Sequence, residues 1–174
     1  LASDEDSLEV RGVVSVSPGN GACDTLFMDE PLNSIVCMSS SSVAALSAIG
    51  AESHITGVSG LKYISEEKIH RMAGEERIFD IGYESSLDYE TLVRLSPDLV
   101  VAYTVGDSEP PYLAKLRNLG FRVFIIYDHL EQHPLARAEY VRLFGALTGR
   151  LPQAEKFFTE VKDRYLSLWV DTCE

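Results

Sequence analysis

Four consecutive serines, Ser39 to Ser42, have the type and spacing to support chemistry. They follow the apolar run Ser34–Met38 and precede a helix-like segment, so they lie where a strand turns into a helix. A serine at such a turn is usually a helix N-cap, and a row of hydroxyls and free backbone N–H groups can also hold a polar ligand. We expect Ser39, Ser40 and Ser41 to contact a ligand. Ser41 or Ser42 as a nucleophile is the alternative, although the hydrolase pattern Gly-x-Ser-x-Gly is missing.

Several tyrosines fall at or just past the ends of expected strands: Tyr63, Tyr83, Tyr103 and Tyr127. One such tyrosine is usually half-buried packing. Several that converge on one edge suit a flat, hydrophobic ligand with polar rims, because each offers an apolar face and a hydroxyl.

His129 and His133 are four residues apart, a spacing that would place both on one face of a helix as metal ligands. Pro134 argues against a helix there, because the residue before a proline avoids the helical region. We therefore expect no metal site. A binder of zinc or manganese ions that uses His129 or His133 stays open as an alternative, which metal analysis would test.

Composition excludes some classes of partner. The net charge of −12 and a pI near 4.7, with no basic cluster, exclude nucleic acid as a partner. Cys23, Cys37 and Cys173 are too few and too far apart for a zinc site or a disulfide framework. The charges at Glu9 and Arg11 argue against a lipoprotein cleavage site at Cys23. The nucleotide-binding glycine motifs are missing as well.

Apolar runs and turn residues predict elements that alternate between strand and helix. This alternation predicts βαβ units with a parallel sheet, whose binding sites lie beyond the carboxyl ends of the strands. The expected strands are Leu8–Ser17 and Thr25–Met28, which form a hairpin, followed by Ser34–Met38, His54–Val58, Leu99–Tyr103 and Phe121–Tyr127. The expected helices are Val43–Ile49, Glu66–Met72, Ser86–Leu95, a segment from Pro110 or Pro111 to Gly120, a segment from Pro134 to Gly149, and Pro152 to about Trp169.

An ordered series of motifs resembles the class III periplasmic substrate-binding proteins of ABC importers, which carry iron–siderophore complexes, haem and vitamin B12. The resemblance covers about Asn33 to Leu168 and rests on the order of the motifs more than on any single one. The series comprises Ile35-Val36-Cys37-Met38-Ser39, Ile55-Thr56-Gly57-Val58-Ser59, Asp80-Ile81-Gly82-Tyr83, Leu95-Ser96-Pro97-Asp98-Leu99-Val100, Leu116-Arg117 with Leu119-Gly120-Phe121, and Leu143-Phe144-Gly145.

That family has two α/β lobes joined by one long helix, with the ligand clamped between them. The resemblance implies a Rossmann-like first lobe with a central parallel sheet, followed by the linking helix, with the second lobe absent from this chain. The implied divisions are a tether and hairpin at 1–33, the ligand-binding lobe at 34–150, the interlobe helix at 151–170 and a tail at 171–174. Apolar residues of the last helix, among them Phe157, Val161 and Tyr165, exceed what one lobe should need to cover.

The resemblance also implies roles for particular residues. Glu90 matches the glutamate that pairs with arginines of the membrane permease, and the loop holding Tyr83 and Glu84 matches a ligand-contacting segment. Hydroxamate-siderophore binders have an arginine where Glu84 stands, so haem, a corrinoid or another iron complex fits better than an anionic siderophore.

The implied protein is not an enzyme and needs no cofactor. It would bind a small metal chelate, an iron–siderophore complex, haem or cobalamin, in the periplasm or cell envelope after loss of a leader, with a lipid anchor as one option. The rival from another class is a free-standing flavodoxin-like α/β enzyme, such as a serine hydrolase.

Overall fold

The structure is a computed structural model that describes residues 12–16, 24–83, 86–105 and 110–170. Cys23, Cys173, Glu84 and the acidic tether at 1–7 lie outside the described residues. Within the described residues no helix is long and apolar enough to cross a membrane.

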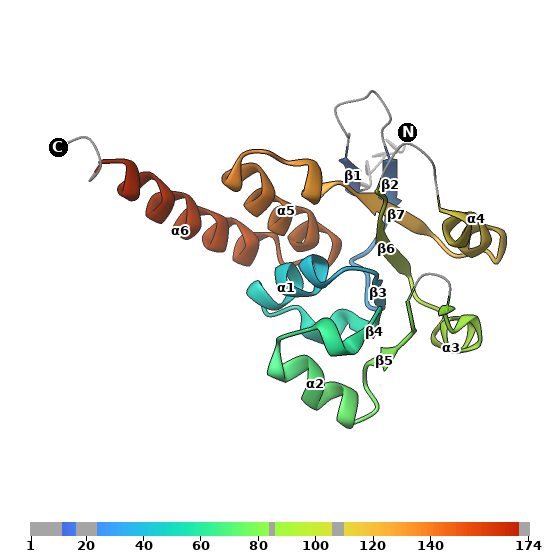
Figure 1. The fold of residues 1–174 in the computed structure, drawn as a ribbon. Helices are drawn as coiled ribbons and strands as arrows, with labels where there is room; N and C mark the ends of the chain where they lie inside the picture. The colour runs from blue at the N-terminus through green and yellow to red at the C-terminus, as the bar shows by residue number, and fades with distance from the viewer. Residues whose placement is uncertain (1–11, 17–23, 84–85, 106–109, 171–174) are drawn as a thin grey trace, which may run out of the picture.

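A five-stranded parallel sheet forms the centre of the molecule (Figure 1). Its strand order is β5-β4-β3-β6-β7, with β3 in the middle. Part of the apolar run Ser34–Met38 forms the central strand, Ile35–Cys37, and all three residues of this strand are buried. A strand of this kind needs cover on both faces of the sheet. The predicted α/β fold with a parallel sheet is confirmed. The strands are β3 (Ile35–Cys37), β4 (Ile55–Val58), β5 (Phe79–Asp80), β6 (Leu99–Tyr103) and β7 (Val123–Ile126).

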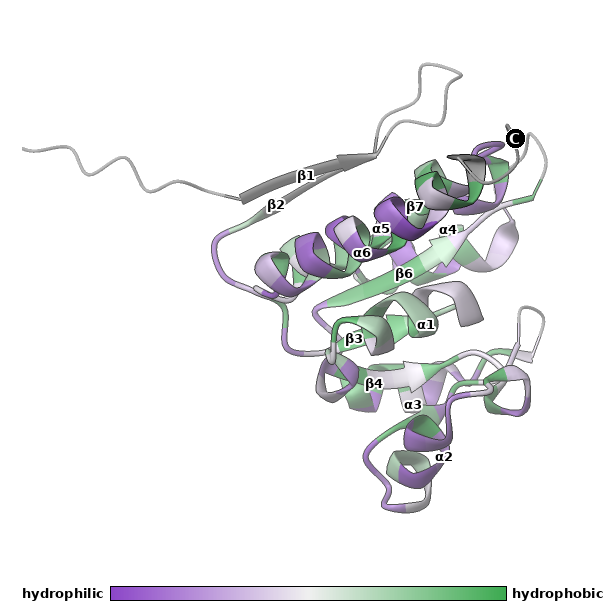
Figure 2. Cartoon of the chain, turned by 90° about the vertical axis from the view of Figure 1, so that its left-hand side faces the viewer, coloured by the Kyte–Doolittle hydropathy of each residue, from purple (hydrophilic) through white to green (hydrophobic). Residues whose placement is uncertain are grey.

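Helices cover both faces of this sheet, which produces two apolar cores. Ile35 and Cys37 of β3 face the larger core, and Val36 between them faces the smaller one, as the alternation of a strand requires. Figure 2 shows the apolar strands between helices whose outer sides are polar. Helices α1 (Ser40–Ala48), α2 (Glu67–Gly74), α5 (Pro134–Leu147) and α6 (Leu151–Val170) lie on the first face, and α3 (Tyr89–Leu95) and α4 (Pro111–Asn118) on the second (Figure 1).

The predicted hairpin is present as a separate antiparallel pair, β1 (Gly12–Val16) with β2 (Asp24–Met28). Single turns of 3-10 helix join the main elements, among them η1 (Glu52–His54), η2 (Leu61–Tyr63) and η4 (Asp128–Leu130). The expectation that His54 opens a strand is wrong, because its ring nitrogen Nδ1 lies 2.8 Å from the Leu32 carbonyl oxygen and the residue belongs to η1.

The last helix, α6, extends well beyond the sheet (Figure 1). Its first half packs on α5, where Ala154 and Phe158 are buried. A Cβ atom placed on Gly145 of α5 would lie 2.5 Å from the Ala154 Cβ, so this crossing depends on glycine. Further along α6, an open apolar groove of about 380 Å³ is lined by Phe157, Val161, Tyr165 and Leu168 together with Glu160 and Arg164.

Candidate ligand-binding site

An open pocket of about 570 Å³ lies at the carboxyl edge of the sheet. Residues at or just after the ends of all five parallel strands reach it, which is where an open α/β sheet places its ligands. The lining residues are Met38, Ser39, Ser40, Ser41, Ser59, Tyr63, Tyr83, Tyr103, Asp128, His129 and Arg137. The pocket therefore brings together six of the seven residues expected to contact a ligand.

The serine run caps α1 and turns hydroxyls toward the pocket. Ser39 is the N-cap, and its Oγ accepts a hydrogen bond from the Ser42 backbone N–H at 3.3 Å. Ser42 is buried, with its Oγ 2.8 Å from the Ser39 Oγ, so it serves the helix start and not the pocket. None of the four histidines, all of which the structure describes, bonds a hydroxyl of this run. An adjacent base is one way in which a serine becomes a nucleophile, and within the described residues the histidines do not supply it.

Four aromatic rings form a row along the pocket. Tyr63 and Tyr83 meet edge to face with ring centroids 6.4 Å apart. The hydroxyl oxygens of Tyr83 and Tyr103 are 3.4 Å apart, and the Tyr103 ring contacts His129 at 6.2 Å. Tyr63 and Tyr83 are 64% and 45% exposed, and the Lys62 ammonium lies over the Tyr63 ring, 4.9 Å from its centroid. We call Tyr63, Tyr83, Tyr103 and His129 the aromatic row.

Asp80 holds the two loops that carry the first half of this row, a role that the sequence analysis missed. Its carboxylate accepts hydrogen bonds from the backbone N–H groups of Gly60 and Gly82, both at 3.0 Å, and of Leu61 at 2.9 Å. Gly82 has φ +77°, and a Cβ there would lie 2.3 Å from the Ser86 carbonyl oxygen. The order Asp-x-Gly just before Tyr83 is the only sequence signal for this arrangement.

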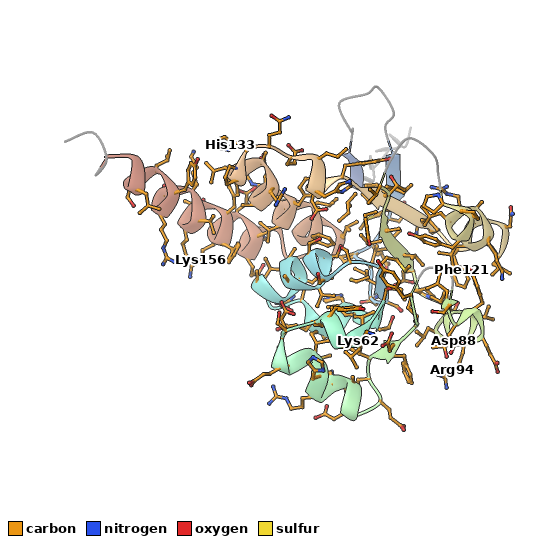
Figure 3. All side chains as sticks on the ribbon, in the orientation of Figure 1. Lys62, Asp88, Arg94, Phe121, His133 and Lys156 are labelled. Atoms are coloured by element: carbon orange, nitrogen blue, oxygen red, sulfur yellow. The ribbon has the colours of Figure 1, made fainter. Side chains whose placement is uncertain are left out.

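The β7 side of the pocket adds Asp128 and Arg137, which the sequence analysis did not select. The two histidines that it weighed as metal ligands point to different places. His129 joins the aromatic row, whereas His133 lies at the start of α5 (Figure 3) and caps it. The His133 ring contacts Tyr165 of α6, with ring centroids 5.6 Å apart. No group of three or more His, Cys, Asp or Glu within the described residues could hold a metal ion.

Tyr127 directly follows β7, at the strand end where it was expected, but it packs against the smaller core and is not among the residues that line the pocket. Cys37 is fully buried, and burial raises the pKa of its thiol to about 12, so it stays a protonated apolar residue. Glu84, the remaining expected contact, lies outside the described residues.

Glu90 lies in the first turn of α3, exposed to solvent. Asp88 caps that helix by accepting from the Thr91 backbone N–H at 2.9 Å and from its hydroxyl at 2.7 Å. These hydrogen bonds lower the pKa of Asp88 below its usual value. Helix α3 therefore begins at Tyr89 and not at Ser86, and Glu90 has a fixed, accessible position.

The model of the periplasmic binding protein family matches residues 35–169. The chain belongs to this family. The match spans the five-stranded sheet, the pocket and nearly all of α6.

An uncharacterized lipoprotein of Methanocaldococcus jannaschii is 28% identical over 144 residues, which are 79% of this chain and 34% of that protein. The periplasmic vitamin B12 binding protein BtuF of Vibrio cholerae has a TM-score of 0.58 at 21% identity, over 81% of this chain and 51% of that one. A periplasmic heme binding protein of Pseudomonas aeruginosa has a TM-score of 0.59 at 21% identity, over 81% and 48%. The siderophore binding protein BauB has a TM-score of 0.67 at 14% identity, over 94% and 55%. The chain thus spans about a third of the curated relative and about half of these solved structures.

Proposed function

We propose that this chain is the first lobe of a solute-binding protein that captures an iron complex and delivers it to the permease of an ABC importer. The observation that carries the proposal is the pocket itself, where an aromatic row faces a serine-capped helix start. Aromatic faces beside a few placed polar groups suit a flat apolar ligand with polar rims. An open pocket of this kind is expected of half of a two-walled cleft.

The family and the similar structures support this choice of ligand. BtuF binds vitamin B12, and other similar structures bind heme or a ferric siderophore. Cobalamin is the second candidate, favoured by the similarity to BtuF. The lipoprotein name of the curated relative supports a place in the cell envelope, with a lipid anchor as one option.

A second lobe would close the pocket in the full-length protein. The open groove on α6 offers an apolar surface on which that lobe could pack, because Leu166 and Leu168 are 47% and 63% exposed and Phe157 is only partly buried. Exposed Glu90 would then present its charge to arginines of the permease. We propose the division into lobe, linking helix and tail on the same grounds.

Titration of the full-length protein with three complexes tests the function. The probes are haemin, a ferric hydroxamate siderophore and cyanocobalamin, each followed by its visible absorbance. A variant of the pocket lining, Ser40→Trp, is titrated alongside the wild type. Saturable binding of haemin or the ferric siderophore, weakened by Ser40→Trp, is the expected result, whereas binding of cyanocobalamin alone would favour the second candidate. Failure of all three to bind contradicts the proposal.

A further inference from the structure

Among the described residues that line the pocket, Arg137 is the one lysine or arginine. It lies on α5, one turn after Pro134, and its side chain reaches back over η4. The Nε–H group donates to the Asp128 carbonyl oxygen at 3.2 Å, and Nη2 donates to the Glu131 carbonyl oxygen at 3.3 Å. These two bonds fix the plane of the guanidinium without neutralising its charge.

No carboxylate within the described residues forms an ion pair with Arg137. Asp128 supplies the carboxylate among the described residues that line the pocket, yet its bond to Arg137 runs through the backbone oxygen. The other arginine of α5, Arg142, forms ion pairs with the carboxylates of Glu139 and Glu155. Arg137 thus keeps its charge and its Nη1 donors available to the pocket.

We propose that Arg137 binds an acidic group of the ligand and so makes the pocket selective for anionic metal complexes. This inference rests on the proposed function and names the class of ligand within it. A guanidinium pairs with carboxylates through parallel hydrogen bonds, which gives both affinity and a fixed orientation. The ligand's flat body would lie along the aromatic row, with its acidic edge at the β7 end, where His129 and Arg137 both line the pocket.

The position of Arg137 also bears on the expectation drawn from Glu84. An arginine is missing at that place in the sequence, which disfavours an anionic siderophore. A cation instead enters the pocket from α5, on the other side of the sheet order. Anionic ligands are therefore compatible with this pocket, and their acidic group would bind at the β7 end, opposite the loop that holds Glu84.

Haemin and its dimethyl ester separate charge from shape, because they share one flat macrocycle and differ in two carboxylates. The full-length protein and three variants are titrated with both, and with cyanocobalamin and a neutral ferric hydroxamate. Arg137→Gln removes the charge, Arg137→Lys keeps it, and Arg71→Gln removes an exposed arginine of α2 as the matched control. Thermal unfolding of each variant reports whether the η4 contacts are needed for folding.

The wild type should bind haemin at least tenfold more tightly than the ester, the scale of one charged hydrogen bond. Arg137→Gln should abolish that preference, whereas Arg137→Lys and Arg71→Gln should keep most of it. Equal binding of haemin and ester by the wild type overturns the inference, as does an equal loss for both ligands in Arg137→Gln. Binding of only the neutral complexes overturns it too but leaves the proposed function standing. If none of the four complexes binds, the proposed function fails, and the inference with it.

Discussion

The hydroxyl oxygens of Tyr83, which follows β5, and Tyr103, the last residue of β6, lie 3.4 Å apart, although β4 and β3 separate these two strands. Strand β5 and strand β6 are three strand spacings apart, about 14 Å. The two side chains therefore extend toward each other across the carboxyl ends of the central strands. This contact makes the aromatic row continuous and gives the pocket one wall instead of isolated rings.

Removing the Tyr83 side chain should weaken ligand binding. Tyr83→Ala should cost about 1–2 kcal/mol of binding free energy in the two-lobed protein, the scale of a lost aromatic contact with its buried area. Tyr83→Phe separates stacking from hydrogen bonding or iron ligation, because only the hydroxyl is lost. Calorimetric titration measures both, with Tyr89→Phe as a control away from the pocket. An unchanged dissociation constant for Tyr83→Ala would show that Tyr83 is packing only, and Tyr63 and Tyr103 would become the residues to test.

Asp80 should affect binding without touching the ligand. Asp80→Asn keeps the size of the side chain but weakens the hydrogen bonds from Gly60, Leu61 and Gly82, so the loops of Tyr63 and Tyr83 should loosen. We expect about 1 kcal/mol of lost unfolding free energy and a clear loss of ligand affinity.

Asp98→Asn is the matched control, because Asp98 accepts from the backbone N–H groups of Asn33 and Ser34 at the other edge of the sheet. That variant should lose a similar amount of stability and keep its affinity. Equal affinity losses in the two variants would show a general effect of stability and refute a positioning role for Asp80.

The crossing of α5 and α6 should not tolerate a methyl group at Gly145. Gly145→Ala would place its Cβ 2.5 Å from the Ala154 Cβ and 3.1 Å from the Leu151 Cα, so the helices must separate. Overpacking of this kind costs about 1–3 kcal/mol of unfolding free energy. Gly74→Ala at the end of α2 has no atom within 4 Å of the new Cβ and should be neutral or stabilising. Urea denaturation compares the two, and equal stabilities would refute the close approach.

Glu90 should matter for transport and not for binding. In the full-length protein, Glu90→Lys should keep ligand affinity and lower the rate of uptake through the permease, because a surface charge pair steers assembly. Glu67→Lys, an exposed glutamate in the first turn of α2, is the control. Uptake at the wild-type rate would remove the docking role, and loss of ligand binding would place Glu90 in the cleft.

Much of the fold could be predicted from the sequence because its elements have clear boundaries. Pro134 and Gly149 delimit α5, and the unbroken apolar run Leu99–Tyr103 could only be a covered strand. Strand β5 was missed because it has two residues, and the start of α3 was misplaced because Leu87 is buried in the loop before the Asp88 cap.

The site was predictable where strand ends alone locate it. Ser39, Tyr63 and Tyr103 follow directly from the rule that ligands bind beyond the carboxyl ends of parallel strands. Arg137 was missed because nothing in its neighbourhood shows which way a helical arginine turns. Asp80 was missed because its partners are backbone N–H groups, which leave no pattern in the side chains.

We propose that the pocket at the carboxyl edge of the sheet holds a metal complex. The most direct test is a crystal structure of the full-length protein grown with a bound complex, with the metal located by its anomalous scattering. We predict a single metal peak beside Ser40, Tyr83 and Tyr103, with an acidic group of the ligand at Arg137. A metal peak elsewhere on the molecule, with this pocket filled only by solvent, would contradict the account.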